Sequence, residues 1–254
     1  MKRPHANPLA LSLAVVLATF CAALLGAAGE PGQTNKIRVL LVTGGHDYET
    51  NQFLQVFKDN PAITCQAVAL PKAHACLRPD AAKDWDVLVC YDMWQDISDE
   101  AKADFVNCLK QGKGLVALHH CLGSYQKWDQ YANIIGGKYH LEKWVDNGVE
   151  KPASTYKHGV DFRVKVADAR HPVTRGVSDF DIHDETYGGY EVKPGVRVLL
   201  TTTEPSNSPT IAWVKTNENA RVVYLQLGHD HLAWDNPNYR QLLAQAIRWV
   251  ARRR

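Results

Sequence analysis

The chain has 254 residues, with 29 lysine and arginine residues against 27 aspartate and glutamate residues, and its formal net charge is +2. Apart from the arginines at 252–254, no basic stretch runs along the sequence, so nucleic acid is not an expected partner. The length suits one globular domain with a full hydrophobic core, although length alone does not exclude two domains.

The first 28 residues have the pattern of a secretory signal peptide. Lys2 and Arg3 form a basic start, the segment 9–25 is almost wholly apolar, and small residues follow at 26–28. This order predicts export with cleavage after Ala28, a periplasmic or secreted location, and no membrane span after cleavage. The alternative is an uncleaved membrane anchor, for which the apolar stretch has about the minimum length.

Export would place the rest of the chain in an oxidising compartment, where disulfides can form. The cysteines after the signal segment are odd in number, so at least one stays unpaired within the chain, and their spacings match no zinc-ribbon pattern. They are Cys65, Cys76, Cys90, Cys108 and Cys121. Cys65 and Cys76 are a candidate pair for a bridge, which the sequence alone does not establish.

The first half of the chain alternates apolar runs typical of buried strands with amphipathic segments typical of helices. The expected strands are 36–43, 62–70, 85–91 and 115–118, and the expected helices are 49–60 and a segment capped by Ser98 and ended by Gly112. Continuous apolar strands that alternate with helices indicate parallel pairing through right-handed crossovers. The fold class predicted for 36–254 is therefore α/β with a mainly parallel sheet.

The second half has a less regular pattern. Its segment 122–160 contains tyrosines and tryptophans among polar residues, and the aromatic part of it, 125–144, suits stacking against sugars. The later expected elements are strands at 162–166 and 196–202, a hairpin of 210–215 with 221–227, and a final helix that begins at Asn236-Pro237.

Polar side chains directly follow several of the predicted strands. Five of the chain's 11 histidines do so, which is more clustering than independent surface histidines would show. They are His46, His119, His120, His229 and His231, and Tyr91 and Trp94 follow the third strand. Ligands bind beyond the carboxyl ends of the strands in an open parallel sheet, so these residues are expected to converge on one site.

The turn at His119 and His120 and the acidic stretch 181–189 complete the expected site. If strand geometry continues to His120, the two histidine side chains point to opposite sides. We expect His120 to face the cleft and His119 to contact the scaffold. The stretch 181–189 is expected to be a loop that brings Glu185 and Tyr187 to the same place.

Six segments together resemble the ThuA-like (trehalose-utilisation) domain proteins. They are LVTGGHDYE (41–49), GKGLVALHH (112–120), YANIIGGKYH (131–140), HPVTRGV (171–177), IHDETYGGY (182–190) and LQLGHDHLAWDNPNYRQLLAQAIRWV (225–250). The resemblance spans 36–254 and implies a flavodoxin-like, three-layer αβα sandwich related to class I glutamine amidotransferases. It also implies a role in sugar metabolism, with a carbohydrate or an oxidised (3-keto) sugar as the small-molecule partner.

The amidotransferase relation raises the question of a cysteine nucleophile. In that class the nucleophile follows a strand in a Gly-x-Cys-x-Gly turn, and the catalytic histidine lies in a His-Pro-Glu motif. Here Cys121 and Gly123 match the turn, but His119 replaces its first glycine, and His229 lacks the orienting glutamate. A cysteine nucleophile needs a base and the base needs an orienting group, so the histidines are favoured over Cys121.

Three functions are compatible with these residues. The first is an enzyme that acts on a sugar by hydrolysis, elimination or isomerisation, the second is a cysteine hydrolase that uses Cys121, and the third is a non-catalytic sugar-binding module. The candidate catalytic residues are His46, His119, His120, Asp184, Glu185 and His229, and the candidate substrate-binding residues are Tyr91, Trp94, Tyr187 and His231.

Two chemistries fit the candidate residues. One is a divalent metal ion, zinc or similar, held by His46, His120, Glu185 and His229. The other is a metal-free general acid–base site built from the same side chains. The sequence favours neither, and it does not give the oligomeric state.

Overall fold

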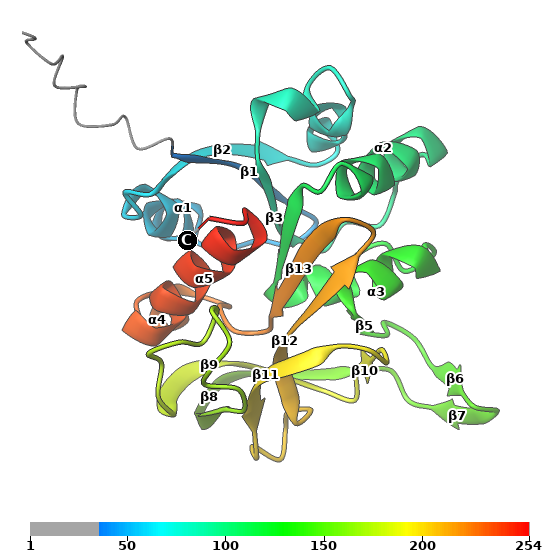
Figure 1. Cartoon of the computed structure of the whole chain (residues 1–254). Helices are drawn as coiled ribbons and strands as arrows, with labels where there is room; N and C mark the ends of the chain where they lie inside the picture. Colours follow the sequence, from blue (N-terminus) through cyan, green and yellow to red (C-terminus); the bar gives the residue numbers. More distant parts are fainter. Residues whose placement is uncertain (1–35, 254) are drawn as a thin grey trace, which may run out of the picture. The chain divides into compact units, whose positions relative to one another are not determined.

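The computed structural model describes residues 36–253, and the predicted signal segment with its cleavage site lies outside the described residues. A nine-stranded sheet crosses the described part in the order β2-β1-β3-β4-β13-β12-β11-β8-β9 (Figure 1). Its strands are β1 (Ile37–Gly44), β2 (Ile63–Ala69), β3 (Val87–Asp92), β4 (Gly114–Leu118), β8 (Thr155–Val166), β9 (Phe180–Gly188), β11 (Arg197–Thr202), β12 (Thr210–Asn217) and β13 (Ala220–Leu225).

The sheet is mixed rather than mainly parallel. From β2 through β1, β3 and β4 to β13 every pair is parallel, as the sequence predicts. From β13 through β12, β11 and β8 to β9 every pair is antiparallel. The expectation of a mainly parallel sheet is therefore wrong for the second half of the chain. The short turn between β12 and β13 is a hairpin connection, which only antiparallel neighbours can use.

Helices cover both faces of the sheet (Figure 1). They are α1 (Thr50–Lys58), α2 (Asp99–Lys110), α3 (Asp129–Ile135), α4 (His231–Trp234) and α5 (Pro237–Val250). Alternate residues of β1 point to opposite faces of the sheet. Val39 and Leu41 pack in one core with α1, α4 and α5. Leu40 and Val42 pack in a second core with α2 and α3. This arrangement confirms the expected three-layer αβα sandwich.

Local signals set the helix ends. The hydroxyl oxygen of Ser98 accepts a hydrogen bond of 3.2 Å from the Ala101 amide, which confirms the predicted cap of α2. The side chain of Asn236 accepts from the Asn238 amide at 2.9 Å at the start of α5, where Pro237 occupies the first helical position. Such caps satisfy amides that have no partner inside the helix.

Two long strands replace segments that the sequence pattern leaves irregular. β8 begins at Thr155 rather than at 162, and the stretch 181–189, expected to be a loop, lies almost entirely in β9. The two strands pair with each other, with Tyr156 opposite Tyr187. The polar side chains on β9 hide the strand pattern because several of them are buried instead of exposed to solvent.

The smaller elements are two short ribbons and three short 3-10 helices. The ribbons are β5 (Gly137–Lys138) with β10 (Glu191–Val192) and β6 (Trp144–Asp146) with β7 (Val149–Lys151), and the 3-10 helices are 72–77, 82–84 and 119–123. The cysteines of the described part are all free thiols, so the candidate bridge between Cys65 and Cys76 is not formed. Within residues 36–253, no helix combines the length and apolarity needed to cross a bilayer.

A buried carboxyl at the end of β3 makes stability depend on pH. Asp92 is 1% exposed, and it accepts hydrogen bonds from the Ser124 hydroxyl at 2.7 Å and the Trp94 amide at 3.4 Å. Burial outweighs these bonds and raises the pKa of Asp92 to about 6. The folded protein therefore holds this proton more tightly than the unfolded chain, so the stabilising contribution is complete at low pH and is lost as the pH rises through 6.

We expect Asp92→Asn to remove this pH dependence. Relative to the wild type, the variant should gain up to about 3 kcal/mol in free energy of unfolding between about pH 4 and pH 8, because its side chain never ionises. Urea unfolding of both proteins at the two pH values measures the difference. Parallel pH profiles for the two proteins would contradict the expectation.

Candidate functional site

A cavity of about 280 Å³ lies at the carboxyl ends of the parallel strands, where they meet β8 and β9. His46 comes from the turn after β1, Met93 follows β3, and His120 follows β4. The full lining is His46, Met93, His120, Gly123, Tyr139, Leu141, Tyr156, His158, Glu185 and Tyr187. The structure thus places a cavity at the rim where the sequence predicts a site.

The turn after β4 separates His119 from His120. Strand geometry ends at Leu118, and His119 adopts a left-handed backbone conformation with φ of 50° at the start of a 3-10 helix. Its ring is fully buried, and Nδ1 donates to the Gln226 carbonyl at 2.5 Å. The ring of His120 instead lines the cavity. The expected division holds, but its cause is the left-handed residue rather than strand alternation.

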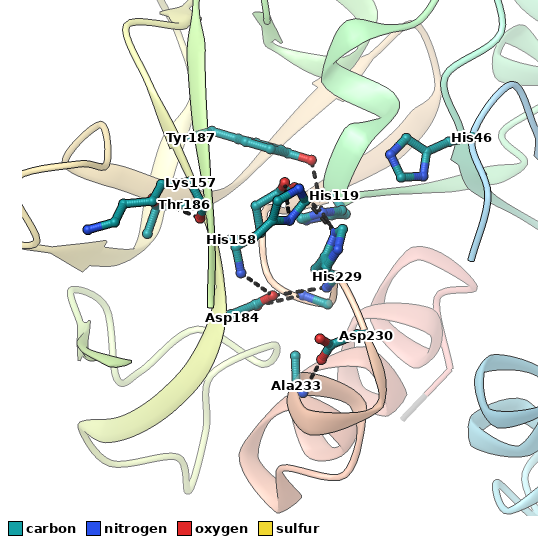
Figure 2. A network of polar contacts seen from close by, with 12 residues as sticks. His46, His119, Lys157, His158, Asp184, Thr186, Tyr187, His229, Asp230 and Ala233 are labelled. Carbon is teal, nitrogen blue, oxygen red and sulfur yellow. Dashed lines mark hydrogen bonds and ion pairs between the residues drawn. The ribbon is translucent and has the colours of Figure 1, made fainter. Parts of the chain in front are cut away.

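Glu185 is the charged centre of the site. Its carboxyl group is 4% exposed and lies 3.0 Å from His119 Nε2, 2.9 Å from His158 Nδ1 and 3.3 Å from His229 Nδ1. Figure 2 shows these three histidines gathered between β9 and the turn after β13. Burial raises the pKa of Glu185, but the adjacent imidazoles of His119 and His229 outweigh this effect and hold the pKa well below its usual range. The side chain is therefore a carboxylate.

Two side chains outside the cavity wall fix the backbone of His229. Asp184 is 2% exposed, and its carboxylate accepts from the amides of Gly228 at 2.8 Å and His229 at 2.9 Å (Figure 2). The hydroxyl of Tyr91 donates to the carbonyls of the same two residues. Gly228 has φ of +110°, and a Cβ there would lie 2.7 Å from the Tyr239 hydroxyl, so only glycine fits.

Two of the predicted site residues make these contacts. Asp184, predicted to be catalytic, and Tyr91, predicted to bind substrate, position the His229 loop from outside the cavity lining. His229 itself is partly exposed beside the cavity, and its hydrogen bond to Glu185 raises its pKa against the effect of burial.

His46 and His120 form a stacked pair on the other side of the cavity. Their ring centroids lie 4.5 Å apart with an interplanar angle of 19°. The turn that carries His46 needs glycine at Gly45, where φ is +77° and a Cβ would lie 2.7 Å from the Met93 backbone. Neither ring nitrogen of His120 has a hydrogen-bond partner among residues 36–253, although the residue is only 4% exposed.

The unpartnered ring of His120 is the unusual polar group of the site, because buried polar atoms are nearly always hydrogen-bonded. Burial, together with the neighbouring imidazoles, lowers its pKa well below the usual value. His120 is therefore a neutral imidazole with free nitrogens in a cavity wall, which is the state of a base or of a ligand-binding group.

Among the predicted substrate-binding residues, only Tyr187 lines the cavity. Its hydroxyl lies 2.9 Å from His119 Nε2. Trp94 is absent from the lining, and His231 is half-exposed and paired through Nδ1 with the carboxylate of Glu49 at 2.9 Å. Both residues follow predicted strands, and neither belongs to the cavity lining.

Six residues of the cavity lining are not among the predicted site residues: Met93, Gly123, Leu141, Tyr139, Tyr156 and His158. Tyr156, His158 and Val160 occupy every second position of β8, and Phe162 and Val164 continue the series. This period of two was a usable strand signal. The pattern does not identify Glu185 as the partner of His158, because Glu185 lies on another strand.

Cys121 is a packed side chain rather than an exposed nucleophile. It is fully buried, and its sulfur accepts a hydrogen bond of 3.3 Å from the Asp92 amide. Burial raises the pKa of its thiol well above the usual value, so the thiolate needed for attack is disfavoured.

A three-layer α/β sandwich with its polar site at the carboxyl ends of the parallel strands defines a protein of the class I glutamine amidotransferase-like fold. A glutamine amidotransferase from Thermotoga maritima superposes with a TM-score of 0.50 at 9% identity, covering 85% of this chain and 98% of that one. Within this class, the chain belongs to the ThuA family, described as trehalose utilisation, whose model matches residues 38–250.

Two ThuA-like proteins of known structure share the fold. The protein from Parabacteroides merdae superposes with a TM-score of 0.70 at 18% identity, covering 85% of this chain and 90% of that one. The protein from Bacteroides uniformis gives a TM-score of 0.66 at 20% identity, with 89% and 95% covered. No match is found among curated proteins.

Proposed function

We propose that this chain is an exported enzyme that performs acid–base chemistry on a carbohydrate bound in the cavity. The observation that carries the proposal is the presence of two groups in the lining of one cavity: the buried carboxylate of Glu185, held by imidazoles, and the partnerless imidazole of His120. The signal pattern of the first 28 residues supports export.

The cavity suits a single sugar ring. Its volume of about 280 Å³ lies at the small end of the range for ligand pockets. Tyr139, Tyr156 and Tyr187 offer aromatic surface for the apolar faces of a sugar, and the imidazoles offer hydrogen bonds to its hydroxyl groups. Membership of a family described as trehalose utilisation supports a carbohydrate as the ligand.

His120 is proposed to move the proton. As a neutral imidazole it can accept a proton from a bound sugar, and the resulting imidazolium can return that proton at a later step. With an oxidised (3-keto) sugar, the proton would leave the carbon beside the carbonyl and its electron pair would shift to the carbonyl oxygen. Such proton transfers are shared by isomerisation, elimination and hydrolysis, and the proposal covers that class of reaction.

The cysteine-hydrolase alternative is less well supported. In enzymes with a nucleophile elbow, the residue on the strained turn between strand and helix presents the nucleophile. Here His119 has the left-handed conformation after β4, and Cys121 is buried two residues later with its sulfur against Asp92. The other alternative is a non-catalytic sugar-binding module. Turnover of a sugar by the purified protein would exclude it.

The test is to incubate the purified protein with a panel of disaccharides and their 3-keto forms and to identify products by mass spectrometry. On the sugar that is turned over, His120→Ala should lower the rate by about 100-fold or more, while Cys121→Ala should keep most of it. Circular dichroism checks that both variants fold. Loss of turnover in Cys121→Ala alone, with inactivation of the wild type by iodoacetamide, would establish the cysteine hydrolase instead.

A further inference from the structure

Three side-chain atoms beside the cavity are spaced like the ligands of a metal ion. His119 Nε2 lies 3.0 Å from Glu185 Oε2, and His229 Nδ1 lies 3.3 Å from each of these atoms. A metal ion about 2.0–2.2 Å from its nitrogen and oxygen ligands separates neighbouring ligand atoms by roughly 2.8–3.6 Å in tetrahedral or octahedral geometry. All three distances fall in that range without movement of a side chain.

The hydrogen bonds of His119 are an independent reason to expect a cation between these atoms. A carbonyl only accepts, so Nδ1 must carry the proton that it shares with the Gln226 carbonyl. In a neutral ring Nε2 then holds a lone pair, and it faces the carboxylate of Glu185, which also only accepts. A cation between the two atoms turns this repulsive contact into an attractive one.

A tyrosine hydroxyl also contacts His119. The hydroxyl of Tyr187, 2.9 Å from His119 Nε2, is the donor that competes for the lone pair when no ion is bound. A bound ion would accept the lone pair of Nε2 and the charge of the Glu185 carboxylate together.

We propose that His119, Glu185 and His229 bind one divalent first-row transition-metal ion. Two imidazoles and one carboxylate, with a side left open, form the donor set of catalytic zinc sites and of related iron sites. The outer contacts also fit, because ligand histidines usually donate their second ring nitrogen and ligand carboxylates are themselves hydrogen-bonded. Here Gln226 holds His119, and His158 holds the second oxygen of Glu185.

This ligand set differs from the one that the sequence pattern suggests. His46 and His120 are replaced by His119, because the first two rings stack on each other at the opposite wall. Among the described residues, the ligand atoms that gather within 4.8 Å of one another belong to His119, Glu185 and His229, and neither His46 nor His120 contributes one. The two stacked rings therefore remain free to contact a sugar. An ion on Glu185 would adjoin the cavity, where it could polarise a sugar carbonyl.

Metal binding can be measured without a substrate, so it is tested separately from the proposed enzymatic function. Wild-type protein is stripped with a chelator, loaded in turn with Zn²⁺, Mn²⁺ and Fe²⁺, and passed through a desalting column before metal analysis. We expect one equivalent of at least one of these ions to remain per chain. Retention of none of the three by the unsubstituted protein would overturn the proposal.

Variants identify the ligands. Glu185→Gln and His229→Ala should weaken binding of the retained ion by at least about 100-fold, which exceeds the loss typical of an outer-shell partner. His46→Ala should retain the ion, because His46 is outside the set, and His231→Ala is the matched control, since it removes an imidazole that pairs with a glutamate away from the cavity. Equal loss in His46→Ala would show that the ion lies elsewhere in the site.

Discussion

Replacing Glu185 by glutamine is expected to lower turnover of the sugar by about 10²–10⁴-fold while the protein stays folded. Glutamine keeps the shape of the side chain but removes the negative charge that faces His119, His158 and His229. His158 and His229 then lose the charge-assisted contacts that orient them. Initial rates on the identified sugar measure the loss, and circular dichroism with thermal unfolding verifies the fold.

The chain contains a matched control for this substitution. Glu49 also pairs with an imidazole, that of His231, but the pair is partly exposed and away from the cavity lining. Glu49→Gln removes the same charge from the same kind of contact, so it should leave turnover unchanged. If Glu185→Gln also keeps the wild-type rate while His120→Ala loses it, the carboxylate is a structural group and the proposed chemistry must rest on the imidazoles alone.

The parallel half of the fold could be predicted because its signals are local. The apolar run of β1 and the Ser98 cap of α2 are each set by a few neighbouring residues, and the structure confirms both. The β8–β9 pair was missed because the polar side chains of the site interrupt the alternation along β9. Its buried polar residues, Asp184 and Glu185 among them, are explained only by partners on other strands.

The position of the candidate site could likewise be predicted from the sequence, whereas its individual contacts could not. That histidines gather at the carboxyl ends of parallel strands follows from topology, and His46, His120 and Glu185 do line one cavity. The individual contacts could not be derived in this way. His119 reaches Glu185 because its backbone is left-handed, and His158 arrives from β8, whose start the sequence pattern did not give.

Asp184 and Glu185 are adjacent carboxylates that lie in different surroundings. Glu185 faces the cavity and the imidazoles, whereas Asp184 points to backbone amides. Successive residues on a strand project to opposite faces, so the sequence pair Asp-Glu serves two different surroundings. The consequences of removing each side chain should therefore differ in kind: loss of chemistry at Glu185 and loss of stability at Asp184.

Asp184→Ala is expected to lower the free energy of unfolding by about 3–5 kcal/mol. The carboxylate accepts from three amides, those of Glu185 at 2.8 Å, Gly228 at 2.8 Å and His229 at 2.9 Å, and the side chain is 2% exposed. Alanine leaves these buried donors without an acceptor and releases the turn that carries His229. Asp184→Asn keeps one accepting oxygen and should lose about half as much.

Urea unfolding measures this loss, and Asp161→Ala is the control on the paired strand β8. Asp161 also contacts a histidine, His183, but its side chain is 86% exposed. Removing it should change the free energy of unfolding by less than about 0.5 kcal/mol, because exposed ion pairs contribute little. A loss in Asp184→Ala no larger than that of the control would mean that Tyr91 alone holds the turn through its contacts with the carbonyls of Gly228 and His229.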